Sequence, residues 1–92
     1  MPSFLVETYL ARGQAAQLSG REQRARSAAD ELTQEKKRVR FDRSIHIPED
    51  ELCFFVFDAP SSRDALRAAE RAELDPIRIV EAVSSSKPKE DR

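Results

Sequence analysis

The spacing of hydrophobic and polar positions along the chain changes several times, and each change marks a predicted element. Apolar or β-branched runs predict strands at residues 3–10, 52–57 and 77–83, and an alternation broken only by Arg43 predicts a strand at residues 39–47. Apolar residues at helical spacing, most of them alanine, predict helices at residues 14–36 and 61–73. Ser61 and Asp64 have the spacing of a capping box at the start of the second helix, whose expected buried stripe is Ala65, Leu66, Ala69 and Ala72.

This order, βαββαβ, is typical of the ferredoxin-like α+β fold. Right-handed crossovers then predict a four-stranded antiparallel sheet with both helices on one face. Residues 1–83 make one domain. Residues 84–92 carry no large apolar side chain, so we expect a disordered polar tail.

A symmetric turn at residues 48–51 fixes the expected register of the central hairpin, with His46 opposite Cys53 and Ser44 opposite Phe55. Alternation then predicts one face under the helices, made of Val39, Phe41, Ile45, Ile47, Leu52, Phe54 and Val56. The opposite, open face would hold Arg40, Asp42, Ser44, His46, Cys53, Phe55 and Phe57. Two aromatic rings on an open face favour a covering second copy, so we expect a homodimer with a two-fold contact.

Composition narrows the functional classes. The chain has 92 residues, a net charge of −1, one Cys, and no apolar run long enough for a signal peptide or a membrane span. We therefore expect a cytoplasmic protein with a reduced cysteine and with neither a nucleic-acid nor a membrane partner. The basic run at residues 36–43 lies on an expected edge strand, where Lys and Arg prevent unwanted strand pairing, so we interpret it as a solvated edge.

Candidate chemistry is sparse, because the sequence has no glycine-rich phosphate loop, CxxC pair or HExxH motif. His46 and Cys53 are the metal-ligand candidates, since an imidazole and a thiolate suit nickel, zinc or copper. The alternative is that Cys53 is a small core residue and His46 a polar residue of an edge strand. Glu7 and Glu81 lie on neighbouring strands and would share a proton or cation, with Arg78 as an alternative partner for the charge.

Four segments together resemble a bacterial family of domains of unknown function whose members are often labelled nickel-binding proteins. They are residues 2–7, 48–54, 57–61 and 78–82, and the resemblance runs from residue 2 to about 83. It implies a dimeric α/β-barrel assembly and, for some relatives, nickel binding. Members with the nickel label have a His and a Cys where this chain has Arg43 and Phe55, although Cys53 is expected on the same face as Phe55.

The resulting hypothesis is a homodimer that binds a small ligand or a divalent metal such as nickel between its sheets, without turnover. Its ligand-binding residues would be Ser44, Phe55, Phe57 and Glu7, with His46 and Cys53 as metal ligands. The alternatives are a cofactor-free oxygenase or isomerase with His46 or Glu7 as base, and a purely structural interaction module.

Overall fold

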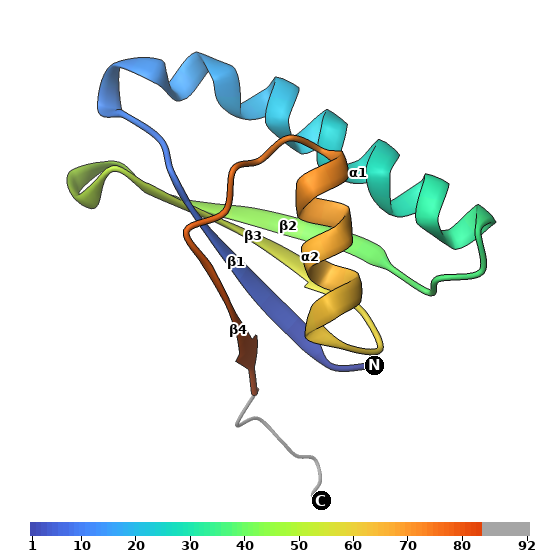
Figure 1. Ribbon diagram of the computed structural model, residues 1–92. Helices are drawn as coiled ribbons and strands as arrows, with labels where there is room; N and C mark the ends of the chain where they lie inside the picture. The colour runs from blue at the N-terminus through green and yellow to red at the C-terminus, as the bar shows by residue number, and fades with distance from the viewer. Residues whose placement is uncertain (84–92) are drawn as a thin grey trace, which may run out of the picture.

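The computed structural model describes residues 1–83 and has the predicted βαββαβ order. Its elements are β1 (Ser3–Tyr9), α1 (Leu18–Gln34), β2 (Arg40–Ile47), β3 (Leu52–Asp58), α2 (Ser62–Arg71) and β4 (Arg78–Ala82), with short 3₁₀ helices at Arg12–Gln17 and Pro48–Asp50. All neighbouring strands are antiparallel, in the order β2-β3-β1-β4. Both helices cover the same face of the sheet (Figure 1). The fold is therefore the predicted ferredoxin-like one; the tail expected at 84–92 lies outside the described residues.

The hairpin of β2 and β3 has the predicted register near its turn. His46 is opposite Cys53 and Ser44 is opposite Phe55. Farther from the turn the register shifts by one between Phe41 and Arg43, because Asp42 is an extra residue on β2. Such a β-bulge reverses the side-chain alternation of the strand that carries it.

The predicted assignment of faces is wrong for most of the hairpin, and the bulge explains why Phe41 and Ile45 of β2, which were expected on one face, lie on opposite faces. Cys53, Phe55 and Phe57 belong to the core beneath the helices, together with Val39 and Phe41. The remaining residues predicted under the helices lie on the open face instead; these are Ile45, Ile47, Leu52, Phe54 and Val56. Because β3 is apolar on both sides, its own sequence does not reveal which side the helices cover.

The core between sheet and helices consists of large side chains from the sheet and small ones from the helices. Phe55 and Phe57 have no solvent exposure, and Phe41 packs against both rings, with centroids 6.2 and 5.4 Å away. The helices contribute mainly alanines, namely Ala25, Ala28 and Ala29 from α1 and Ala65, Ala68 and Ala69 from α2. Small helical side chains let the helix backbones approach the sheet closely, so the aromatic rings of β3 fill most of this core.

One residue of the predicted stripe on α2 is not in the core. Leu66 is 38% exposed, whereas Ala68 is fully buried. Leu66 lines a hollow with Pro76, Ile77 and Ile79, beside β4. Since β4 is the last strand on that side, the sheet does not extend far enough to cover Leu66.

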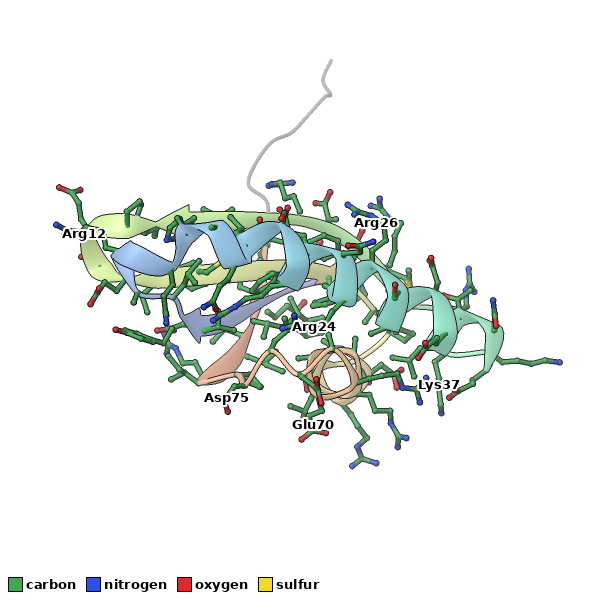
Figure 2. All side chains as sticks on the ribbon, turned by 90° about the horizontal axis from the view of Figure 1, so that it is seen from above. Arg12, Arg24, Arg26, Lys37, Glu70 and Asp75 are labelled. Atoms are coloured by element: carbon green, nitrogen blue, oxygen red, sulfur yellow. The ribbon has the colours of Figure 1, made fainter. Side chains whose placement is uncertain are left out.

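Arginine side chains connect the two helices. Arg24 on α1 lies between the helices in Figure 2 and donates from Nε to the carbonyl oxygen of Ala72, at the end of α2 (2.8 Å). Arg71 on α2 pairs with Glu35 just beyond α1 (2.7 Å), and this hydrogen bond lowers the pKa of the Glu35 carboxyl below its ordinary value. These contacts fix α2 against α1 above the sheet.

No helix within residues 1–83 is long and apolar enough to cross a membrane.

Candidate functional site

The six residues singled out from the sequence fall into two separate places. Ser44, His46, Cys53, Phe55 and Phe57 all lie on the helix side of β2 and β3, whereas Glu7 is on the open side, where it is opposite Phe54. The two expected metal ligands, His46 and Cys53, are therefore neighbours, as predicted, but they lie on the helix side of the sheet and not on the open face. The aromatic rings expected to line a cavity between two sheets are core residues of a single chain.

The helix-side group includes a half-buried polar corner beneath the start of α1. Ser44 Oγ donates a hydrogen bond to the carboxylate of Glu22 on α1. His46 Nε2 is buried with no hydrogen-bond partner within the described residues. Cys53 has no solvent exposure, and burial raises the pKa of its thiol from 9.0 to about 11. The charge of Arg21 lowers this pKa by a smaller amount, and the charge of Glu22 raises it.

Within a single copy these groups do not complete a metal site. Residues 1–83 contain no group of three or more His, Cys, Asp and Glu side chains placed to hold a metal. Metal binding would have to displace the proton of the Cys53 thiol, and burial, which raises the pKa of this thiol to about 11, makes that less favourable than at an exposed cysteine. His46 and Cys53 thus correspond more closely to the alternative, a core cysteine opposite a partly buried edge-strand histidine.

The open face has an apolar centre that extends across all four strands. Leu5, Phe54 and Val80 are half-buried there, and Ile45 is 39% exposed. A hollow of about 470 Å³ lies on this face, and its walls are Leu5, Ile45, Val56, Ala82 and Val83 with the polar residues Ser3, Asp42 and Arg43. An apolar centre with a few polar groups at its margin is typical of a ligand or partner surface.

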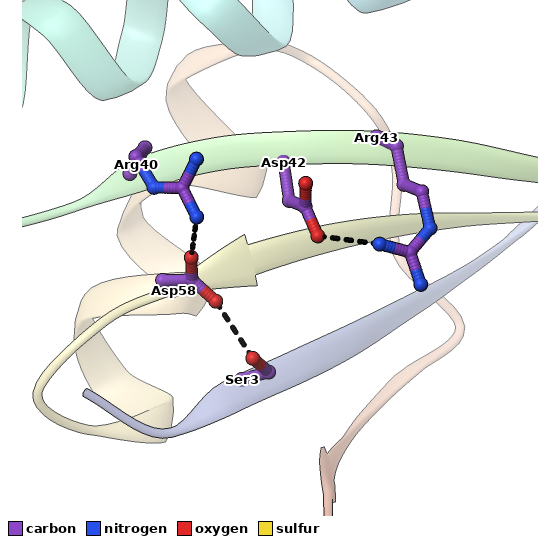
Figure 3. Close-up of polar contacts among 5 residues, drawn as sticks. All are labelled: Ser3, Arg40, Asp42, Arg43 and Asp58. Atoms are coloured by element: carbon purple, nitrogen blue, oxygen red, sulfur yellow. Dashed lines mark hydrogen bonds and ion pairs between the residues drawn. The ribbon is translucent and has the colours of Figure 1, made fainter. Parts of the chain in front are cut away.

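Charged side chains border this apolar centre at the end where β2 begins. Figure 3 shows Asp58, at the end of β3, between Arg40 of β2 and Ser3 of β1. Arg40 forms an ion pair with Asp58, and Ser3 Oγ donates to the same carboxylate over 2.6 Å. Asp42 and Arg43 pair with each other over 2.7 Å (Figure 3). The sequence interpretation missed this group, because only the bulge brings Arg43 onto the same face as Asp42.

Glu7 borders the other end of the apolar centre. It is opposite Arg78 in the β1–β4 register, and Arg78 Nε donates to it over 2.8 Å. Glu81 is opposite Phe4, whose side chain is in the core, so the two glutamates are on different faces of the sheet. The carboxylate pair considered from the sequence is therefore wrong, and the alternative partner, Arg78, is correct.

Comparison with known proteins supports the fold and goes no further. No protein-family model matches the chain, and no curated protein matches it. The crystal structure of SCO4226 from Streptomyces coelicolor A3(2) is similar, with a TM-score of 0.71 and 19% sequence identity. The match covers 91% of this chain and 99% of that one. At this identity the likeness establishes a shared ferredoxin-like fold alone.

Proposed function

We propose that this protein is a non-catalytic homodimer whose two copies pack through the open faces of their sheets and hold a small ligand between them. The observation that carries the proposal is the apolar centre of the open face, where Ile45 is 39% exposed beside a hollow of about 470 Å³. Water contact with a contiguous apolar surface is unfavourable, and a second copy is the simplest cover.

The walls of the hollow favour one kind of ligand. Leu5, Ile45 and Val56 offer an apolar wall, while Asp42 and Arg43 lie at its margin. A small molecule with an apolar body and an anionic group would bury the body and pair with Arg43, which is exposed and whose one ion pair among the described residues is with the neighbouring Asp42.

Two features support binding without turnover. Glu7, the one expected base on the open face, is neutralised by Arg78. His46, the other candidate, lies on the helix side, away from the hollow. A general base needs direct or one-water access to its substrate, and neither residue has a free approach from the hollow. We also propose a cytoplasmic location, with which a single buried, free cysteine is consistent.

Sedimentation velocity at several protein concentrations tests the dimer. Ile45→Glu places a charge in the apolar centre, and we expect it to give a monomer at concentrations where the wild type is a dimer. Leu66→Glu is the matched control, because Leu66 on α2 is 38% exposed and lies outside the open face. A wild type that is monomeric at micromolar concentration, or equal effects of the two substitutions, would contradict the proposed dimer.

Ligand binding is tested with 8-anilinonaphthalene-1-sulfonate, a probe with an apolar body and one sulfonate. We expect one probe per dimer, with binding weakened by Arg43→Ala and lost in Ile45→Glu. Calorimetric titration with nickel, zinc and copper is the companion measurement. Tight metal binding that disappears in both His46→Ala and Cys53→Ser would overturn the assignment and favour a metal-binding protein.

A further inference from the structure

The flank of α2 that faces away from α1 is apolar at its centre. Leu66 is 38% exposed there, and Ile77, just before β4, is 57% exposed, although both are large aliphatic side chains. Two adjoining hollows, of about 480 and 610 Å³, meet at this centre and share Leu66 and Pro76 as walls. Because β4 is the last strand on this side of the sheet, no described element covers these side chains (Figure 1).

The two ends of this flank carry opposite charges. Arg63 lines the hollow nearer the start of α2, and Glu70, two turns later, lines the hollow nearer its end. Figure 2 shows Glu70 on the side of α2 away from α1. Neither residue forms an ion pair with a residue between 1 and 83. A cation and an anion without partners therefore lie on either side of one apolar centre.

The neighbouring charged residues are engaged elsewhere or lie outside the two hollows. Arg78 is held in its ion pair on the open face. Glu73 and Asp75 also line a third hollow, whose walls include two arginines of α1. Arg67 and Glu81 line neither of the two hollows on this flank. The charges that α2 itself presents to these hollows are those of Arg63 and Glu70.

The order Arg63, Leu66, Glu70 is self-complementary. The three residues are three and four positions apart, so they follow one side of the helix. When two copies of α2 lie antiparallel about a two-fold axis beside Leu66, each Arg63 is next to Glu70 of the other copy. Leu66 is then next to its own equivalent. A parallel arrangement would bring like charges together instead.

We propose that two copies of this chain associate through the outer flank of α2, which consists of Arg63, Leu66, Glu70, Pro76 and Ile77. The contact pairs each Arg63 with Glu70 of the other copy and packs the aliphatic side chains of both copies together. It is independent of the proposed open-face dimer, because the helices and the open face are on opposite sides of the sheet. Together the two contacts would join open-face dimers into larger assemblies.

A second copy is favoured over a foreign partner because of the symmetry of the charges. A foreign partner places no condition on how the charges of this flank are arranged. A two-fold contact requires opposite charges at equal distances from its centre, and Arg63 and Glu70 meet that condition on either side of Leu66.

The outer flank is small, so the contact should be weak, with a dissociation constant on the order of 100 μM to 1 mM. At micromolar concentration it is sparsely populated, and Leu66→Glu then has no effect on an open-face dimer. The contact becomes important where the local protein concentration is high.

The test is reversal of charge in protein that carries Ile45→Glu, which is designed to remove the open-face contact. Sedimentation equilibrium up to about 1 mM protein measures the remaining association. Arg63→Glu alone and Glu70→Arg alone should each weaken it by about tenfold or more, because each puts like charges opposite one another. An equal mixture of the two variants should associate within about threefold of the parent protein, because both pairs are again opposite in charge.

The control is the same exchange of charge near the hairpin turn, away from α2. Arg12→Glu and Glu49→Arg change exposed residues that line neither hollow, and Figure 2 shows Arg12 at the far end of α1 from Lys37. Alone or mixed, these variants should change the association by less than about twofold. The two mixtures match in net charge, so an equal gain in both would mean general attraction and would overturn the contact through α2.

NMR spectra show which surface associates. In the Ile45→Glu protein, the methyl signals of Leu66 and Ile77 should shift as the protein concentration rises, whereas those of Leu5, on the open face, should not. Shifts at Leu5 without shifts at Leu66 and Ile77 would overturn the proposal.

Two further results would also overturn it. They are no association of the Ile45→Glu protein up to about 1 mM, and a mixture of Arg63→Glu with Glu70→Arg that associates no better than either variant alone. Glutamate near the start of a helix and arginine near its end suit the helix dipole, so far-UV circular dichroism should show both variants folded. The open-face dimer is measured at micromolar concentration, so failure of one contact is distinguishable from failure of the other.

Discussion

Phe41 and Arg43 are two residues apart on β2, yet their side chains are on opposite faces of the sheet. Phe41 packs in the core beneath the helices, whereas Arg43 lines the hollow on the open face. In a regular strand these two positions share a face, so the reversal is due to the extra residue between them, Asp42. The bulge thereby decides which surface Ile45 and Ile47 present.

Deletion of Asp42 should therefore leave the fold intact. Phe41 would keep Phe57 as its partner and Arg43 would keep Val56, now in a regular strand. The loss is an exposed ion pair with Arg43, so we expect a change in the free energy of unfolding within about 1 kcal/mol. Urea denaturation measures it.

Deletion of Val56 is the matched control. It removes one residue from β3, which has no bulge to absorb the change, and it forces Phe55 or Phe57 out of the core. We expect this variant not to fold, because a shift of one residue reverses the faces of the strand. Equal damage from the two deletions would show that the bulge is not a removable insertion.

Phe55 and Phe54 should respond differently to truncation. Phe55→Ala empties part of the core and should cost about 3–5 kcal/mol at every protein concentration. Phe54 is on the open face, so Phe54→Ala should lower stability mainly through the dimer, and its effect should grow with protein concentration. Thermal unfolding over a hundredfold range of concentration distinguishes the two. An effect of Phe54→Ala that is independent of concentration would argue against packing through this face.

The buried thiol of Cys53 makes stability fall at alkaline pH. Its pKa is raised to about 11 in the folded protein from 9.0, so the unfolded chain loses this proton first as the pH rises. The contribution is fully present below pH 9 and is lost between pH 9 and 11, at no more than about 1.4 kcal/mol per pH unit. Unfolding of the wild type and of Cys53→Ala across this range should show a steeper decline for the wild type. Parallel curves would mean that the thiol is not perturbed.

Ser61 provides the N-cap of α2. Its side-chain oxygen accepts a hydrogen bond from the backbone N–H of Asp64, as the capping-box spacing predicted. Ser61→Ala should lower the free energy of unfolding by about 1 kcal/mol, and Ser61→Asp should restore most of it because Asp also caps helices. Ser62→Ala, one residue later and within the helix, is the control and should have a much smaller effect.

The sequence was sufficient for the order of elements and for the hairpin register between the turn and the bulge, because a short turn fixes which residues pair next to it. It was insufficient for the faces. Arg43 interrupts the alternation of β2, but an interruption alone does not say whether the strand bulges or simply exposes an arginine. Leu66 was misplaced for a related reason, since helical spacing describes a stripe but not where the sheet beneath it ends.

The candidate site was only partly predictable. The pairing of His46 with Cys53 follows from the turn, but the side of the sheet on which they lie depends on how the helices pack. Asp58 accepts a hydrogen bond from Ser3, and Glu7 pairs with Arg78, each from more than fifty positions away in the sequence. Arg40 pairs with Asp58 beyond the bulge. No local sequence pattern reveals these contacts. For Glu7, the choice between Glu81 and Arg78 depended on the register of β1 and β4.

The apolar run Leu52–Phe57 has a consequence for how the chain escapes aggregation. Six uncharged residues, three of them phenylalanine, with no proline or glycine, have the composition of segments that stack into cross-β fibrils when exposed. In this fold the run becomes β3, and both of its neighbours, β1 and β2, come earlier in the chain. During synthesis the two strands that pair with β3 have therefore already emerged when β3 is made. This aggregation-prone segment can pair with them at once.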